Sequence, residues 1–361
     1  MRVCFRVDAS IQIGSGHVMR CMTLANGICD KGATASFISR PHPGHLCDLI
    51  ERKGFPVARL RPADTGLAER DHRLGATWGE DLEQTKLAIR HLSDPIDWLI
   101  VDHYSLDARW ETQLRSFTRR IMVIDDLADR PHDCDLLLDQ NYYCNLETRY
   151  DALTPPACLK LLGPAYVLLR NEFQKIKHLA KVRNGRVTRI LVFLGGSDPE
   201  NFTAKVLRAL DQVNRSDITI DVVVGASNIH RSDIENICRK RPKTNFHFQV
   251  DNLAELMLSA DLAIGAGGAT TWERCFLGLP ALTIVIADNQ LQTTLDLGAA
   301  GIIWYLGIAD KLSVNDLAEA IFDALSSPIR LREMSARGIQ LMNNQRNVEI
   351  NPVVSALIES T

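Results

Sequence analysis

The apolar residues of this chain follow two patterns that alternate along its length. Short apolar runs predict buried β-strands, and segments whose apolar residues recur every three or four positions predict helices. In the first half, a strand that begins at Val3 and closes on Asp8 precedes a helix whose apolar residues start at Val18. The same reasoning predicts further strands at 34–39, 55–60, 98–102, 121–124 and 136–139, a loop at 61–76, and helices at 46–53, 78–92 and 166–178.

The second half repeats this alternation of predicted strands and helices after a basic stretch at 181–189, which we interpret as a solvated linker. Strands separated by helices predict parallel sheets. We therefore expect an α/β protein with two doubly wound, Rossmann-like domains that face each other across a cleft. We place the N-terminal domain at 1–180, the C-terminal domain at 187–345, and a tail at 346–361 whose helix packs back on the N-terminal domain. The elements predicted in this half are strands at 190–194, 218–224, 245–250, 262–264 and 281–286 and helices at 201–210, 253–259, 270–277, 290–297 and 314–325.

Composition narrows the class of protein. The chain has 361 residues, of which 46% are hydrophobic and 24% charged, and its net charge is −3. This length favours two domains, and this charge gives no electrostatic reason to expect nucleic acid or membrane partners. No apolar run has the length of a membrane-spanning helix, and the N-terminus lacks a signal-peptide core. The nine cysteines include no C-x-x-C pair, so we expect reduced core thiols in a cytoplasmic protein.

The stretch from Gly14 to Arg20 lies between the first strand and the first helix. His17 is predicted at the helix start, where the positive end of the helix dipole favours a neutral imidazole that can accept a proton. Glycines there allow a ligand to approach the backbone closely. We predict that Gly14, Gly16 and Arg20 contact a sugar. The alternative from these residues alone is an ordinary turn with a solvated histidine.

Polar residues follow three strands of the first half. Because parallel strands end at the same edge of a sheet, these residues are expected near a ligand. Alternation places Asp102 and Tyr104 on one side, toward the cleft, and His103 on the other, with a structural role for His103 as plausible as a functional one. Adjacent carboxylates at 125 and 126 resemble a metal pair, but no His/Cys cluster accompanies them, so we prefer a metal-free site. Asn141 is predicted to bind the sugar.

Two glycine-rich turns in the second half are suited to a diphosphate. The cluster around Gly267 and Gly268 follows a strand and precedes a helix, where N–H groups and the hydroxyls of Thr270 and Thr271 can donate to phosphate oxygens. Glu273 is predicted to accept from ribose hydroxyls. The alternative is a tight turn with capping threonines and a surface glutamate. Further diphosphate or nucleotide contacts are assigned to Gly195, Gly196, Ser197, Asn289 and Gln290.

Taken together, the motifs resemble a known family. The chain is similar to the pseudaminic acid pathway hydrolases that act on UDP-2,4-diacetamido-2,4,6-trideoxy-β-L-altropyranose, relatives of GT-B glycosyltransferases such as the one that makes lipid II. The matching stretches are Ile13-Gly-Ser-Gly-His-Val-Met-Arg20, Val101-Asp-His-Tyr-Ser-Leu-Asp107, Asp125-Asp-Leu-Ala-Asp-Arg130, Cys134-Asp-Leu-Leu-Leu-Asp-Gln-Asn141, Leu162-Gly-Pro-Ala-Tyr166, Phe193-Leu-Gly-Gly-Ser-Asp-Pro199 and Ala263-Ile-Gly-Ala-Gly-Gly-Ala-Thr-Thr-Trp-Glu273.

The resemblance implies a GT-B fold, with UDP held by the C-terminal domain and the sugar by the N-terminal domain. It also implies metal-independent and cofactor-free hydrolysis at the anomeric carbon, with His17 as the general base for water and Tyr104 and Asp102 in the catalytic site. Because a GT-B cleft is made within one chain, we expect a monomer. The chain departs from the family at 341–346, where relatives often carry an Asp-Gly-x-Gly turn, and at Asn171, where relatives often have Pro.

Two other functions compete with the hydrolase. A glycosyltransferase on the same fold would pass the sugar to an acceptor hydroxyl, and a nucleotide-sugar-binding regulator would bind UDP without turnover. No Arg/Lys-flanked apolar patch stands out in the first half as a lipid acceptor groove. We therefore predict the hydrolase.

Overall fold

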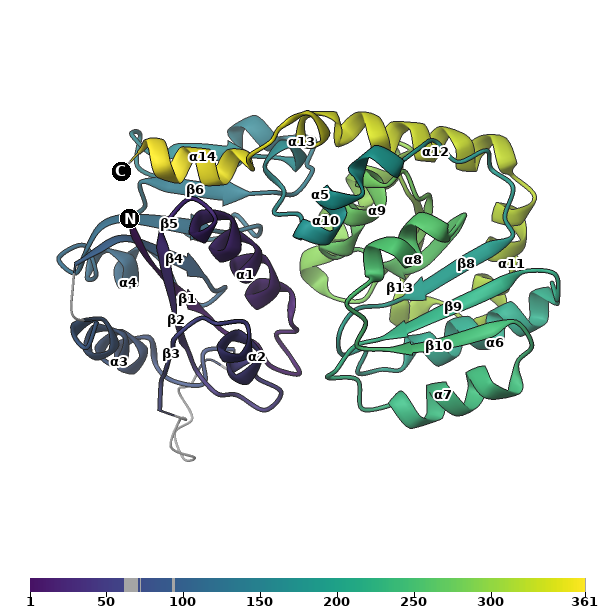
Figure 1. Cartoon of the computed structure of the whole chain (residues 1–361), viewed down its shortest axis with the longest axis horizontal. Coiled ribbons are helices and arrows are strands. Elements are labelled where there is room, and N and C mark those ends of the chain that lie inside the picture. Colours follow the sequence, from purple (N-terminus) through teal and green to yellow (C-terminus); the bar gives the residue numbers. More distant parts are fainter. Residues whose placement is uncertain (62–70, 72, 93–94, 361) are drawn as a thin grey trace. The chain divides into compact units, whose positions relative to one another are not determined.

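The computed structural model describes residues 1–61, 71, 73–92 and 95–360, and it divides into two compact units (Figure 1). Most of the loop predicted at 61–76 lies outside the described residues. The first unit contains residues 1–141, 145–168 and 348–361, and the second contains residues 142–144 and 169–347. The main division therefore follows Leu168, some way before the predicted boundary.

The first unit is built on one parallel sheet. Its strand order among the described residues is β3-β2-β1-β4-β5-β6-β7. Strands β2 and β3 follow β1 on one side of it, and β4 pairs with the other side, so the strand order reverses between β1 and β4. The strands are β1 (Arg2–Val7), β2 (Thr34–Ser39), β3 (Val57–Arg59), β4 (Ile96–Asp102), β5 (Thr118–Ile124), β6 (Leu136–Asp139) and β7 (Leu159–Leu162). The short strand β7 was not predicted, because only four residues separate the turn before it from the one after.

Helices cover both faces of this sheet. The side chains of β1 alternate, so Phe5 packs in the core on the α1 side and Cys4 in the core on the opposite side. The C-terminal tail, for which we expected a helix on this domain, contains α14, whose Val353 and Leu357 are fully buried in the same core as α1. The helices are α1 (Gly16–Cys29), α2 (Cys47–Arg52), α3 (Trp78–Arg90), α4 (Ala108–Thr112) and α14 (Pro352–Glu359).

The second unit has a parallel sheet of order β10-β9-β8-β11-β12-β13. Here the order reverses between β8 and β11. The strands are β8 (Arg189–Phe193), β9 (Thr219–Val224), β10 (Thr244–Phe248), β11 (Leu262–Ala266), β12 (Ala281–Val285) and β13 (Trp304–Ile308). The helices are α5 (Asn171–Lys175), α6 (Phe202–Val213), α7 (Arg231–Lys240), α8 (Leu253–Ser259), α9 (Thr270–Phe276), α10 (Leu291–Ala299), α11 (Val314–Leu325), α12 (Pro328–Leu341) and α13 (Asn343–Asn347).

The α/β class and the GT-B-like arrangement of two doubly wound sheets are confirmed, but several elements differ from prediction. The helix expected at 166–178 is reduced to α5 and short 3-10 turns, because the backbone is extended at Val167 and Arg170, where the chain passes from one unit to the other. The elements α7, β13 and α12 were not predicted. Gly265 lies inside β11 rather than in the loop after it.

The interpretation of 181–189 as a solvated linker is wrong at its centre. Arg183 is 6% exposed, and its guanidinium donates to carbonyl oxygens of Met257, Leu258, Ala260 and Leu277. These carbonyls lie at the C-terminal ends of α8 and α9, where the helix dipoles are negative. The arginine therefore binds two helix ends within the second unit.

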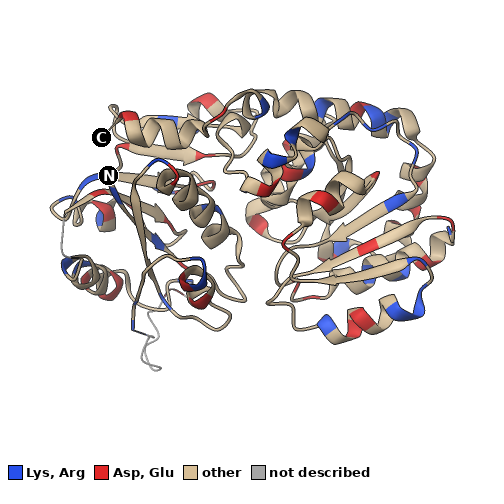
Figure 2. Ribbon diagram, in the orientation of Figure 1, with Lys and Arg blue, Asp and Glu red and all other residues tan. Residues whose placement is uncertain are grey.

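Charged side chains of opposite sign are interspersed on the surface helices, for example along α3 and α7 (Figure 2). No helix among the described residues is long and apolar enough to cross a membrane. All nine cysteines are free, and most are buried as expected, but Cys144 is exposed.

Candidate active site

In the first unit, the predicted catalytic residues lie where the strand order reverses. The chain after β1 forms the loop that leads into α1, and β1 is directly hydrogen-bonded to β4, which ends at Asp102. Ligands of open α/β sheets bind at such a reversal, outside the carboxyl ends of the strands. The fold therefore brings His17 and Asp102, which are far apart in sequence, to one location.

His17 and Asp102 form a close imidazole–carboxylate pair. His17 lies in the first turn of α1, and its Nδ1 atom is 2.5 Å from Asp102 Oδ1. Although burial raises the pKa of Asp102, the charge and the hydrogen bonds of Arg20 lower it far below its ordinary value, so the carboxylate is ionised. An ionised carboxylate accepts, so Nδ1 carries the proton and Nε2 is the nitrogen that can accept one.

Arg20 holds the other side of the same carboxylate. Its Nε atom is 2.6 Å from Asp102 Oδ2, and its Nη2 atom is 2.6 Å from Asp102 Oδ1, which is a bidentate pair. Its Nη1 atom donates to Asp126 over 3.2 Å. These contacts give Arg20 a positioning role that the sequence did not indicate, while its predicted contact with the sugar stays a prediction.

Tyr104 forms one wall beside His17. Its hydroxyl donates to Asp126 Oδ1 over 2.7 Å, and its ring meets the His17 ring edge-on at a centroid distance of 4.6 Å. Burial and the charge of Asp126 raise the pKa of Tyr104 well above its ordinary value. The phenol therefore stays neutral, and its predicted catalytic role stays a prediction.

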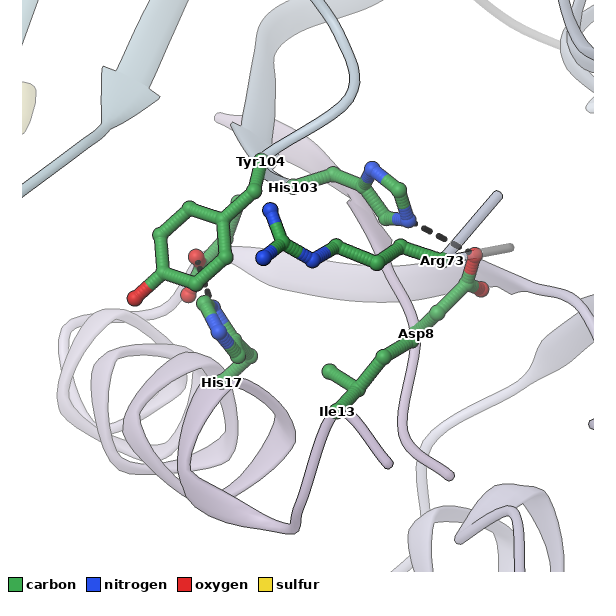
Figure 3. A pocket seen from close by; sticks show the side chains of 7 residues that line it. Asp8, Ile13, His17, Arg73, His103 and Tyr104 are labelled. Atoms are coloured by element: carbon green, nitrogen blue, oxygen red, sulfur yellow. Dashed lines mark hydrogen bonds and ion pairs between the residues drawn. The ribbon is translucent and has the colours of Figure 1, made fainter. Parts of the chain in front are cut away.

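The side chains of His17, Asp102 and Tyr104 line a small pocket (Figure 3). Four of its residues were not predicted as site residues: Asp8, Ile13, Arg73 and His103. Asp8 had a signal in the sequence, since it ends the strand beside β4, and His103 had been left open. Arg73 had none, because it lies in a stretch without periodicity. His103 turns toward Asp8, with Nε2 3.4 Å from Asp8 Oδ2.

The remaining predicted sugar contacts, Gly14, Gly16 and Asn141, lie outside the set of residues that line the pocket. Gly14 has a φ of +81°, and a Cβ on Gly14 or Gly16 would meet no atom within 4 Å, so both glycines border open space. Asn141 follows β6, two strands away from β4, and does not line the pocket. Its backbone N–H donates to Asp139. The sugar-binding role of Asn141 stays a prediction.

A second group of buried carboxylates lies along the ends of β5 and β6. Asp125 pairs with Arg130 at 2.9 Å. Tyr150 donates to Asp139 over 2.9 Å. Burial first, and the charge of Asp126 second, raise the pKa of Asp139 to about 8 despite its hydrogen bonds. No group of three or more His, Cys, Asp or Glu among the described residues is arranged to hold a metal ion.

In the second unit, both glycine turns lie at the reversal between β8 and β11. Gly195 and Gly196 follow β8, and a Cβ on Gly225 would lie only 2.4 Å from the Gly196 carbonyl oxygen. At the end of β11, a Cβ on Gly267 would lie 2.2 Å from Thr294 Oγ1, whereas a Cβ on Gly268 would make only an ordinary contact, with Gln290 Nε2 at 3.6 Å. Gly267 is therefore required by packing, and Gly268 leaves the backbone open to a ligand.

The threonines of this turn differ. Thr271 is 1% exposed and its hydroxyl accepts from the buried Arg274, which also binds the carbonyl of Ala266. The Thr271 hydroxyl is thus buried and holds Arg274, and its predicted donation to phosphate stays a prediction. Thr270 begins α9 and is partly exposed.

Glu273 is held by an arginine. Arg170 donates from Nε and Nη2 to the two carboxylate oxygens of Glu273 over 2.8 and 3.0 Å, and its Nη1 lies 2.7 Å from Glu172. The pair between Arg170 and Glu273 was not predicted from the sequence. It fixes the orientation of the carboxylate predicted to bind ribose.

The turn after β12 supplies the last predicted contacts. Asn289 and Gln290 lie in a 3-10 turn, and Gln290 Oε1 accepts from the backbone N–H of Ile286. The Nε2 atom of Gln290 would be 3.6 Å from a Cβ on Gly268, so its amide donor borders the glycine turn. Ser197 is partly exposed beside Asp198, whose carboxylate caps the start of α6.

Comparison with known proteins supports the fold. Residues 190–347 match the glycosyltransferase family 28 C-terminal domain. The chain also superposes on MurG from Acinetobacter baumannii with a TM-score of 0.67 at 14% identity, covering 100% of this chain and 99% of that one. The chain therefore has a GT-B-like fold.

Three proteins are similar to this chain in sequence. The UDP-2,4-diacetamido-2,4,6-trideoxy-β-L-altropyranose hydrolase of Campylobacter jejuni is 26% identical over 83% of this chain and 97% of that protein. The spore coat polysaccharide biosynthesis protein SpsG of Bacillus subtilis is 29% identical over 99% of both. An uncharacterized protein of Methanocaldococcus jannaschii is 27% identical over 81% of this chain, which spans only 57% of that protein's length. The resemblance to the hydrolase family is confirmed.

Proposed function

We propose that this GT-B protein hydrolyses UDP-2,4-diacetamido-2,4,6-trideoxy-β-L-altropyranose, releasing UDP and the free sugar by attack of water on the anomeric carbon. His17 Nε2 removes a proton from the water, and Asp102 holds the imidazole by its Nδ1–H. The observation that carries the proposal is the 2.5 Å pair between these two residues in a pocket at the sheet reversal. A positioned base of this kind contributes about 10²–10⁴-fold in rate.

The second unit supports the proposal by its glycine turns. The open backbone at Gly268 and the helix start at Thr270 are suited to a diphosphate, whose charge their N–H groups stabilise. A stabilised UDP departs without a dedicated acid, so activation of one water remains the main chemical task. The same turns would hold the nucleotide for either a hydrolase or a transferase.

The activity for which the Campylobacter jejuni relative is named favours the hydrolase, and the similarity spans nearly that whole protein. The family 28 C-terminal domain favours a second candidate, a glycosyltransferase with a UDP-sugar donor. In that case His17 would deprotonate an acceptor hydroxyl in place of water. The two candidates differ in what happens when no acceptor is supplied.

The test is an incubation of the whole chain with the UDP-sugar in ¹⁸O-labelled water and no acceptor. The hydrolase releases UDP and sugar in equal amounts and places the label in the sugar, because water attacks carbon rather than phosphorus. A transferase releases little UDP until an acceptor is added, and a regulator binds UDP without forming product. Release of unlabelled sugar with labelled UDP would contradict the mechanism.

Two histidine variants locate the base. His17→Ala should lower kcat by about 10²–10⁴-fold while the Kd for UDP, measured by calorimetry, stays nearly unchanged. The matched control is His91→Ala, which removes an exposed histidine at the end of α3, outside the pocket. If His17→Ala kept most of the activity, another group would be the base.

A further inference from the structure

The pocket contains a buried imidazole that the proposed reaction leaves unused. The His103 side chain is 3% exposed, and its Nδ1 atom accepts the backbone N–H of Ser105 over 3.1 Å. Since Nδ1 is an acceptor, the proton of the neutral ring is on Nε2. Among the described residues, Nε2 has no hydrogen-bond partner, although Asp8 Oδ2 is 3.4 Å away.

Asp8 accepts shorter bonds from other groups, so its contact with His103 Nε2 at 3.4 Å is a long one. Its carboxylate accepts from Arg6 over 2.9 Å, from the Arg40 backbone N–H over 2.7 Å and from the Ser39 hydroxyl over 3.3 Å. The His103 donor is thus a buried N–H on the pocket wall without a full partner, a costly arrangement unless a ligand completes it.

Arg73 supplies a second group of donors to the same wall. Its guanidinium lies 5.6 Å from the centroid of the Tyr104 ring, and no carboxylate among the described residues pairs with it. Figure 3 shows its side chain running from the Asp8 side of the pocket toward Tyr104. Arg20 differs, because Asp102 and Asp126 hold it. Arg73 is therefore the pocket arginine with donors to offer a ligand.

The chemistry of this wall selects its ligand. Two donor groups face the pocket beside the apolar Ile13, so the wall is complementary to an acceptor oxygen that carries a small apolar group. An acetamido group has a carbonyl oxygen and a methyl group in that arrangement. The diphosphate is a poorer match. In a direct displacement the leaving group departs on the face opposite the attacking water, whereas Arg73 lies against Tyr104, the ring that also contacts His17, the proposed base.

We propose that His103 and Arg73 bind the carbonyl oxygen of one acetamido substituent, with its methyl against Ile13, and thereby select N-acetylated sugars. The inference rests on the proposed function for its substrate. His103 and Arg73 are specificity residues in this scheme and take no part in proton transfer.

The experiment compares three UDP-sugars: the diacetamido substrate and two analogues in which a hydroxyl replaces the acetamido group at C2 or at C4. The wild type should prefer the diacetamido sugar to one of the analogues by about ten- to a hundredfold in kcat/KM, the range expected for hydrogen bonds from charged or buried donors. Arg73→Met should reduce that preference to near unity, mainly through KM. Arg90→Met, which removes an exposed arginine stacked on Phe117 outside the pocket, is the matched control and should keep the preference.

A histidine pair tests the second donor. His103→Asn retains an acceptor for the Ser105 N–H but removes the distal donor, so it should lose the preference. His103→Gln restores an N–H near the position of Nε2 and should recover part of it. Equal loss of kcat/KM on all three sugars in Arg73→Met, or an unchanged preference in His103→Asn, would overturn the subsite.

Failure of the proposed reaction is distinguishable from failure of the subsite. If the wild type hydrolyses none of the three sugars, the same comparison is made by calorimetry on the intact compounds. A preference in Kd that Arg73→Met abolishes supports the subsite without the hydrolase. Equal affinities of the wild type for all three compounds refute it.

Discussion

Replacing Asp102 by Asn separates the structural role of this carboxylate from its catalytic one. Asp102 is 1% exposed and binds both His17 and Arg20. The amide has nearly the same shape, so packing is kept, but its charge is lost. The amide can also donate to Nδ1, which would move the imidazole proton to Nε2 and remove the base.

The expected cost in stability follows from the buried charge left behind. Removing one partner of a buried ion pair costs about 3–5 kcal/mol. Because Arg20 keeps Asp126 at 3.2 Å, we expect the lower end, about 3 kcal/mol. For a unit of this size that corresponds to a decrease in Tm of about 6–12 °C. The chain should still fold at 25 °C, since domains have about 5–15 kcal/mol of stability.

The assay measures the Tm by calorimetry and the rate of UDP release well below it. Asp102→Asn should lose about 10²–10⁴-fold in kcat. The matched control is Asp81→Asn, which removes a fully buried carboxylate from Arg6 while Arg6 keeps Asp8 at 2.7 Å. Asp81 does not line the pocket. It should cost similar stability and keep kcat.

Two outcomes would refute this reasoning. If Asp102→Asn and Asp81→Asn lost stability equally and both kept their kcat, the pair with His17 would have no catalytic role. If both lost kcat equally, the loss would follow from general loosening of the unit rather than from the imidazole.

Three further predictions concern the nucleotide turns and the buried acids. Gly268→Ala should keep the Tm but weaken UDP binding about tenfold in calorimetry, since its Cβ has space within the protein and would project where a phosphate approaches. Gly267→Ala should instead lower the Tm, because its Cβ collides with Thr294. Glu273→Gln should remove the preference for UDP over its 2′,3′-dideoxy analogue, and an unchanged preference would show that the carboxylate serves only to hold Arg170. Asp139 has a folded-state pKa of about 8, above its unfolded value of about 3.9. Between these pH values the folded protein therefore binds one proton more than the unfolded chain. Its free energy of unfolding falls as pH rises through this range, by at most about 1.4 kcal/mol per pH unit. Urea unfolding of Asp139→Asn at pH 5 to 8 should lack this slope, and an identical slope would assign it to other groups.

Much of the fold could be predicted because it depends on local periodicity. The strands at 34–39 and 136–139 and the helices at 253–259 and 314–325 were predicted at the bounds that the structure has. Elements with weak periodicity, such as β7 and α7, were missed. Arg183 shows why a charged residue cannot be assumed to be exposed to solvent. The carbonyl oxygens that bind it come from helix ends more than seventy residues away in the sequence.

The candidate site, too, could be predicted only in part from the sequence. The sequence by itself determined which residue types end each strand and begin each helix, and so it named His17, Asp102, Tyr104 and the glycine turns. Only the tertiary structure decided which of them meet. The order of strands brought Asp102 to His17 and Asp8 to His103, and side-chain packing turned the Thr271 hydroxyl inward. The physical reason is that periodicity records which face of an element is buried, whereas partners across a sheet depend on strand order, and no local pattern encodes that order.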